Sequence, residues 1–214
     1  MNTEDVKIPI INQRSEILDL VPHDVRRVLD VGCGQADVAL TVKRRFDCEV
    51  TGIEIDKAKA SIAASRIDRV ITADEASLEG QLSPGYFDCI IFADVLEHLK
   101  DPCGLLKWYK RYLKKGGSMV ISVPNVRNLK VLFELIFAGE WEYRAHGILD
   151  EGHLRFFTLK SFRRLMYEAR VTPICMKRIF SIKGSGLMNM LTLGLFRDFF
   201  TGQYVFLAKD KETT

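Results

Sequence analysis

The sequence predicts an α/β fold built on a mostly parallel sheet. Short runs of β-branched and other apolar residues alternate with stretches of helical periodicity through much of the chain, which is the pattern of parallel strands joined by helices. Residues 87–93 are almost entirely apolar, as expected of a strand covered on both faces. Hydrophobic residues make up 47% of the 214 residues and charged residues 28%, so the composition is globular and excludes a disordered or fibrous chain.

The first half of the chain alternates regularly between the two kinds of segment. A strand stops at Gly32, and the next stretch carries apolar residues at helical spacing with Lys and Arg on its other side. A later helix, which Asp94 or Asp101 caps, is expected to run to Leu113 and to end in the cations and glycines of 114–117. The predicted strands are 27–31, 49–55, 70–73, 87–93 and 118–123, and the other predicted helices are 36–46 and 57–66.

The alternation breaks after residue 124, where two insertions are expected. Thr158 suits the N-cap of a helix to about residue 170. The remaining predicted elements are an apolar helix at 125–139, an aromatic-rich connection at 140–157, strands at 171–180 and 203–209, and an apolar segment with helical potential at 187–200. We therefore expect a single domain over residues 1–214, with a core of about 25–125 and insertions of about 126–157 and 183–201.

Charge, cysteine content and hydropathy narrow the possible functions. Lys plus Arg number 31 and Asp plus Glu 28, so a net charge of +3 gives no strong nucleic-acid signal, although a local basic patch remains open. The chain shows no signal peptide and no transmembrane run of about 18 apolar residues, so we expect a soluble cytoplasmic protein. Five widely spaced cysteines are interpreted as buried thiols of a reducing compartment: Cys33, Cys48, Cys89, Cys103 and Cys175.

Glycines and acids stand where the predicted strands end. Gly32 and Gly34 follow the first strand, where a residue without a Cβ lets the backbone turn tightly and approach a ligand. A dinucleotide-binding turn would need a third glycine at the position of Asp37, which argues against a nicotinamide-dependent oxidoreductase. Glu54 ends the second strand and can accept both hydroxyls of a ribose. Asp74 ends the third strand and can accept from the amine of an adenine.

Residues 28–36, 50–56, 71–74 and 87–99 resemble successive motifs of class I S-adenosylmethionine-dependent methyltransferases. The likeness continues through 113–117 and 123–125, and more weakly through 153–158. It implies a Rossmann-like three-layer α/β/α sandwich with a seven-stranded sheet whose last strand is antiparallel. It also implies S-adenosylmethionine as cofactor, with Asp30, Gly32 and Gly34 around the methionine part, Glu54 at the ribose, Asp74 and Glu75 at the adenine, and Ala93 and Asp94 beside the sulfonium.

Four polar residues are expected to meet where the acceptor binds. Asp94, Glu97 and His98 share one face of the helix that should begin there, and His153 can approach from the later connection. Two carboxylates and two imidazoles suit Mg²⁺, Mn²⁺ or Zn²⁺. The set is similar to that of RNA 3′-terminal 2′-O-methyltransferases and, in part, of quinone-biosynthesis O-methyltransferases, which commonly have Glu at the first position and a second adjacent histidine that this chain lacks.

Alternatives to a metal site remain open for these residues. Without a metal, His98 or His153 is a candidate general base beside Glu97, and the plainest alternative is that Glu97 and His98 only cap and pack the helix. The expected reaction is O-methylation of a small hydroxylated ring, quinol or glycan-type acceptor. The competing functions are a metal-assisted RNA 2′-O-methyltransferase and a non-catalytic S-adenosylmethionine-binding module, and 187–200 is expected to form a homodimer contact or a peripheral apolar contact.

Overall fold

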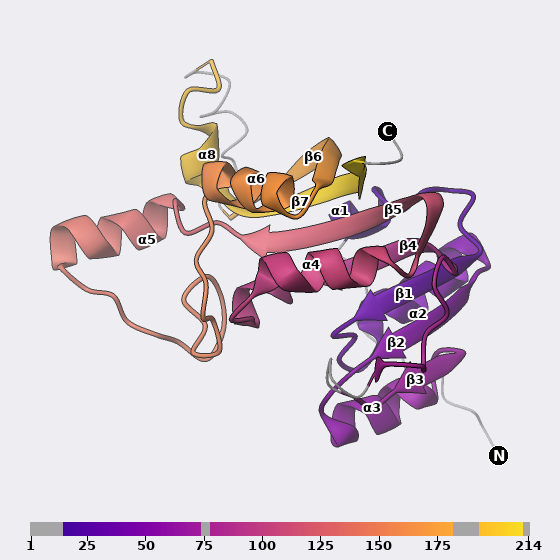
Figure 1. The fold of residues 1–214 in the computed structure, drawn as a ribbon. Coiled ribbons are helices and arrows are strands. Elements are labelled where there is room, and N and C mark those ends of the chain that lie inside the picture. Colours follow the sequence, from indigo (N-terminus) through magenta and orange to yellow (C-terminus); the bar gives the residue numbers. More distant parts are fainter. Residues whose placement is uncertain (1–14, 74–77, 182–192, 212–214) are drawn as a thin grey trace, which may run out of the picture.

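The computed structural model describes residues 15–73, 78–181 and 193–211, which form a sheet with helices on both faces (Figure 1). The predicted adenine-binding residues Asp74 and Glu75, and residues 187–192 of the predicted apolar helix, lie outside the described residues. The strands are β1 (Arg27–Val31), β2 (Glu49–Ile53), β3 (Arg69–Ile71), β4 (Phe87–Ala93), β5 (Leu113–Pro124), β6 (Val171–Phe180) and β7 (Thr201–Asp210). The helices are α1 (Ser15–Leu18), α2 (Asp37–Phe46), α3 (Lys57–Ala64), α4 (Pro102–Lys110), α5 (Leu129–Phe133), α6 (Leu159–Glu168) and α8 (Arg197–Phe200), with a 3-10 turn η2 (Leu96–His98) and a π-helical turn η3 (Glu134–Ala138).

The sheet has the order β3-β2-β1-β4-β5-β7-β6. Its first five strands are parallel, and β7 pairs antiparallel with both β5 and β6. The predicted seven-stranded sheet with an antiparallel last strand is therefore confirmed. The strand order reverses between β1 and β4, and open α/β sheets bind ligands at the carboxyl ends of the strands beside such a reversal.

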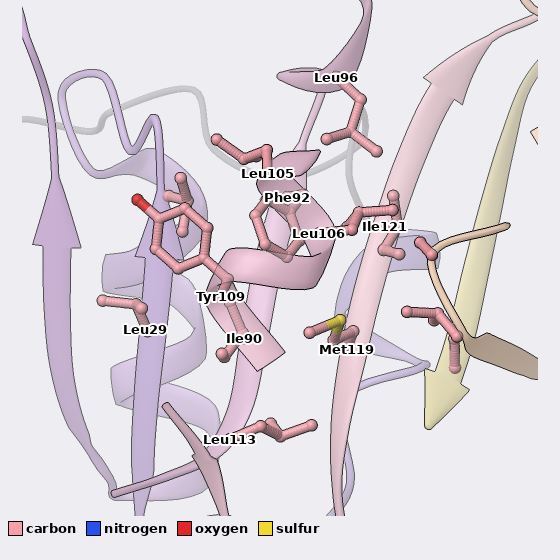
Figure 2. Close-up of a cluster of buried hydrophobic side chains, with 14 of the residues drawn as sticks. Leu29, Ile90, Phe92, Leu96, Leu105, Leu106, Tyr109, Leu113, Met119 and Ile121 are labelled. Carbon is pink, nitrogen blue, oxygen red and sulfur yellow. The ribbon is translucent and has the colours of Figure 1, made fainter. Parts of the chain in front are cut away.

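Side chains of each central strand alternate between two cores. In β4, Ile90 and Phe92 face the layer that contains α4 and α6, whereas Cys89 and Ile91 face the layer that contains α1 and α2. Figure 2 shows α4 laid over the first of these faces. Burial on both faces explains why β4 reads as a continuous apolar run in the sequence.

Most predicted elements through residue 124 are confirmed to within a few residues, but two boundaries were wrong. No α-helix begins at Asp94, because Asp94 has a left-handed φ of 59° and only the 3-10 turn η2 follows it. Asp101 is the N-cap of α4, as predicted, and its carboxylate accepts from the Gly104 N–H. Residues 114–117 do not end this helix, which stops at Lys110, but belong to β5.

The predicted helix at 125–139 begins later than expected. The buried side chain of Asn125 donates to the carbonyls of Asp198 and Thr201, which keeps the chain extended there, and Asn128 caps α5. The helix extends from the body of the molecule, and residues 140–157 return as a long connection (Figure 1). Thr158 caps α6 as predicted, in a capping box with Ser161. Of the apolar segment 187–200, the described part contains the short α8.

The cysteine environments agree only in part with the prediction of buried thiols. Cys33, Cys48 and Cys89 are buried, Cys103 is half-buried, and Cys175 on β6 is exposed because it lies on the edge strand of the sheet. Within the described ranges, none of the helices has the length and apolar character needed to span a bilayer.

Candidate active site

The turn after β1 provides a backbone cradle at the carboxyl edge of the sheet. Gly32 and Gly34 have φ values of 68° and 57°, which L side chains rarely adopt. A Cβ on Gly32 would also lie 2.9 Å from Cγ2 of Val95, so the turn is closed from the β4 side as well. Asp30 lies buried immediately before this turn, at the end of β1.

Glu54 fixes the shape of this cradle. One carboxylate oxygen accepts from the Gly34 N–H at 2.8 Å and the other from the Asp56 N–H at 2.8 Å. Each oxygen retains a second lone pair, so the carboxylate can still accept from ligand hydroxyls. The sequence suggested only the ribose contact, and the structure adds that Glu54 ties the glycine turn to the end of β2.

Two pockets meet at Gly32. The first, of about 400 Å³, is mainly apolar and is lined by Glu54 and Ile55 after β2, Ala73 after β3, Leu99 after η2 and Tyr109 of α4. The second, of about 770 Å³, is polar and extends from the glycine turn to residues 146–153. A ligand with a flat ring, a polar middle and a charged tail would occupy the first pocket and the near part of the second.

The polar pocket is rich in carboxylates. Asp30, Asp37, Asp94, Glu97 and Asp150 line it, and among the described residues its lining contains a single Lys or Arg, Lys59. This balance favours cationic or neutral ligand groups over phosphates.

Cys33 also lines the polar pocket but is not a nucleophile there. Burial, and then the charges of Asp30 and Glu54, raise the pKa of the Cys33 thiol to about 12. A thiol with so high a pKa stays protonated near neutral pH, and the thiolate is the reactive form.

Side chains of two strands, β5 and β7, form hydrogen bonds with Asp94. Its Oδ1 accepts from the Ser122 hydroxyl at 2.7 Å and from the Gln203 side-chain amide, and its N–H donates to the Ser122 oxygen at 3.0 Å. These contacts support the left-handed backbone at Asp94 and place the residue in the polar pocket between the glycine turn and the histidines.

Three of the four expected acceptor-side residues come together. Glu97, His98 and His153 each offer one ligand atom, and these atoms all lie within 4.8 Å of one another. Nε2 of His153 is 4.0 Å from Oε1 of Glu97, and the two histidine ring centroids are 4.7 Å apart. Asp94 lines the same pocket but is not part of this cluster, since Ser122 and Gln203 hold its carboxylate.

Backbone carbonyls orient both imidazoles. Nδ1 of His98 lies 3.0 Å from the Gly152 oxygen, and Nδ1 of His153 lies 2.9 Å from the Ile148 oxygen. A carbonyl can only accept, so each Nδ1 carries the proton and the neutral ring has its lone pair on Nε2. Imidazoles arranged in this way serve as metal ligands or as bases.

The later connection reaches η2 through a small set of backbone contacts. The Glu97 carbonyl accepts from the N–H groups of both Leu154 and Arg155, at 2.8 and 2.9 Å. A Cβ on Gly152 would lie 3.0 Å from Nδ1 of His98, so a side chain at this position would press on the imidazole and shift it. Sequence reasoning found His153 but missed Gly152, Ser122 and Gln203, whose roles depend on long-range pairing.

Comparisons with known proteins identify relatives of this chain. Residues 10–170 match the family described as "Methyltransferase domain". The ubiquinone biosynthesis O-methyltransferase of Paracidovorax citrulli is 34% identical over 139 residues, which cover 62% of this chain and 56% of that protein. The protein of the same name from Pseudomonas aeruginosa is 31% identical over 121 residues, 53% of this chain and 50% of that one. The chain thus spans about half the length of these curated relatives.

Solved structures share the fold. A SAM dependent methyltransferase from Archaeoglobus fulgidus has a TM-score of 0.65 at 18% identity, covering 92% of this chain and 91% of that one. An S-adenosylmethionine dependent methyltransferase from Mesorhizobium loti has a TM-score of 0.63 at 13% identity, with 91% and 95% covered. At these identities the likeness concerns the arrangement of helices and strands.

Proposed function

This chain belongs to the class I S-adenosylmethionine-dependent methyltransferases, and on that premise we propose that it methylates an oxygen of a small hydroxylated acceptor. The acceptor classes that we favour are a small hydroxylated ring, a quinol and a glycan-type acceptor. The observation that carries the proposal is the cluster of Glu97, His98 and His153 in a pocket that opens from the glycine turn.

The residues at the carboxyl edge fit the donor. Asp30, Gly32 and Gly34 would surround its methionine part, Glu54 would accept from its ribose hydroxyls, and the apolar pocket suits an adenine. We propose Ala93 and Asp94 beside its sulfonium, and Asp74 with Glu75 at the adenine amine. When bound, S-adenosylmethionine supplies a methyl group on a positively charged sulfur, which can pass in line to a nucleophilic oxygen.

The histidine cluster would prepare the acceptor oxygen. In the metal-free version, Nε2 of His98 or His153 takes the proton of the acceptor hydroxyl while the oxygen–methyl bond forms and the sulfur–methyl bond breaks. Glu97 would steady the imidazolium that results. The carbonyls of Gly152 and Ile148 keep both Nε2 lone pairs available for this step.

The same three side chains also fit a divalent cation. One carboxylate and two Nε2 atoms form a ligand set found for Zn²⁺, Mn²⁺ and other divalent metals. A cation bound there would lower the pKa of an acceptor hydroxyl. Glu97, His98 and His153 are the proposed ligands, and Asp94 would act beside them rather than as a fourth ligand.

The charge of the polar pocket favours a small neutral acceptor over RNA. Five carboxylates face a single Lys in its described lining, which is unfavourable for a polyphosphate backbone. The names of the relatives, ubiquinone biosynthesis O-methyltransferases, support a hydroxylated ring as the acceptor class.

The test measures S-adenosylhomocysteine release with phenol, catechol, quinol and glycoside probes. Glu97→Gln, His98→Ala and His153→Ala should each lower turnover about a hundredfold or more, while S-adenosylhomocysteine affinity by calorimetry changes less than about twofold. His23→Ala, outside both pockets, is the matched control. Loss of turnover in chelator, with recovery on Mg²⁺, Mn²⁺ or Zn²⁺, would establish the metal version, whereas insensitivity to chelator would establish the histidine base.

Two results would overturn the proposal. Methylation of an RNA oligonucleotide with no turnover of any small probe would assign the RNA alternative. Tight donor binding without methylation of either class of acceptor would leave a binding module.

A further inference from the structure

The positive charge of this chain is concentrated on one helical layer. Residues 100–115 and 154–170 contain eleven Lys and Arg against two Asp and Glu, whereas the rest of the chain contains 20 against 26. The first segment includes α4 and the second includes α6, and both helices cover the same face of the sheet. The net charge of the chain is small because a basic face is balanced by an excess of acidic residues in the rest of the chain. We define the basic face as the exposed side of these two segments.

Many cations of the basic face point into solvent without a counterion. Lys107, Arg111, Lys160 and Arg163 are exposed, and among the described residues none of the four makes an ion pair. Ion pairs that these segments form with other described residues include Lys110 with Asp210, Lys114 with Asp88, and Arg164 with Glu168. Unpaired cations packed on one face attract a polyanionic partner.

An exposed apolar segment, residues 129–143, adjoins the basic face, and we call it the apolar spur. The side chains of Ile136 and Phe137 are 66% and 74% exposed. Further large apolar residues of the spur are also exposed: Leu129, Phe133, Leu135, Trp141 and Tyr143. Clusters of exposed large apolar side chains on soluble proteins commonly mark interaction sites, and Trp and Tyr are enriched where protein meets the boundary of lipid and water.

Contacts along one connection join the spur to the basic face. The rings of Trp141 and Phe156 are 5.1 Å apart. The neighbouring Arg155 donates to the carbonyl of Lys100, just before α4. The same connection also contributes His146 to the polar pocket. Residues 141–156 therefore contribute side chains to all three regions: the spur, the polar pocket and the basic face.

We propose that the basic face and the apolar spur form one docking surface for an anionic phospholipid bilayer. The cations of α4 and α6 attract acidic headgroups, and the spur inserts its apolar side chains at the acyl boundary. A nucleic acid or an acidic protein would match the charge but would offer no apolar medium to Ile136 and Phe137. The combination of the two surfaces is what selects a lipid bilayer.

Vesicle co-sedimentation of the full chain tests this inference. Phosphatidylcholine vesicles containing about 30% phosphatidylglycerol should bind the protein about a hundredfold more tightly than pure phosphatidylcholine, and about 0.5 M salt should weaken the binding. The triple variant Lys107→Glu, Lys160→Glu, Arg163→Glu should lose this preference for acidic lipid. The double variant Ile136→Ser, Phe137→Ser should weaken binding while its salt dependence remains.

Matched controls distinguish a loss of the docking surface from a general effect of net charge and from unfolding of the variant. Arg26→Glu, Arg44→Glu, Lys57→Glu makes the same change of charge outside the basic face and should bind acidic vesicles like the parent. Each variant should keep the parent melting temperature, and one that does not is replaced by its single substitutions. Equal binding to neutral and acidic vesicles, equal loss in both triple variants, or stronger binding to a DNA duplex of about 20 base pairs than to acidic vesicles would overturn the proposal.

Discussion

The proposed donor side of the carboxyl edge is held together by residues that are close in the sequence, whereas the proposed acceptor side is held together by distant ones. On the donor side, Glu54 bonds the N–H of Gly34, 20 residues away. On the acceptor side, His98 meets the Gly152 carbonyl 54 residues away, and Gln203 reaches Asp94 across 109 residues. The donor side is thus built by a strand, a turn and the next strand, whereas the acceptor side depends on an insertion and on the last strand of the sheet. Because the two sides depend on separate contacts, we expect that a substitution on one side can leave the other intact.

Gly32→Val should have the largest effect and remove detectable donor binding. The new Cβ would clash with Val95 at 2.9 Å, and a β-branched residue is strained at a φ of 68°. Calorimetry with S-adenosylhomocysteine measures the loss, expected at about a hundredfold or more from micromolar affinity. Gly116→Val, at a φ of 80° with open space around it, carries the same strain outside the site and should bind normally.

Glu54→Ala should weaken donor affinity by about 5- to 150-fold, or ~1–3 kcal/mol. The variant loses the ribose acceptor and also leaves the Gly34 and Asp56 N–H groups without their carboxylate. Glu54→Gln retains one acceptor oxygen and should fall between the parent and Glu54→Ala. Unchanged affinity in Glu54→Ala would break the assignment of the donor side.

Gly152→Val tests the acceptor side in the same way that Gly32→Val tests the donor side. Its Cβ would press on Nδ1 of His98 at 3.0 Å and displace the imidazole. Turnover should fall about tenfold or more, and donor affinity measured as above should stay within about twofold. A drop in donor affinity as large as that of Gly32→Val would show that the two sides are not separable.

Thr158→Ala should have the smallest effect and should concern stability alone. The Thr158 hydroxyl caps α6 by accepting from the Ser161 N–H at 3.2 Å. Losing a cap costs about 1 kcal/mol of unfolding free energy, which urea titration resolves. Donor affinity and turnover should both match the parent, because Thr158 lines neither pocket.

The elements that form the proposed donor side were predictable because they are close together in the sequence. The strand ending at Val31, the glycines that follow it and the acid at Glu54 lie within one strand–helix–strand unit, and periodicity locates such units well. The apolar run at 87–93 was equally clear because both of its faces are buried. Asp101 and Thr158 were recognised as helix caps because capping depends on residues only a few positions away.

The acceptor side was only partly predictable because its geometry comes from distant residues. The spacing of Asp94, Glu97 and His98 suggested one helical face, but Ser122 and Gln203 hold Asp94 in a left-handed conformation and only a 3-10 turn follows. Glu97, His98 and His153 still come together, since Gly152 lets the later connection pass beside η2. These contacts join residues that are far apart in the sequence, so the periodicity of a single segment cannot predict them.

The place of β7 in the sheet has a consequence for synthesis of the protein on the ribosome. β7 lies between β5 and β6, and β6 pairs with no other strand of the described sheet. Translation runs from the N-terminus, so the hydrogen-bonding edges of β5 and β6 stay open until residues 201–210 have left the exit tunnel. Open strand edges template wrong pairing with other chains. The nascent chain should therefore be most prone to aggregate, and most dependent on chaperones, in the interval between the emergence of β6 and that of β7.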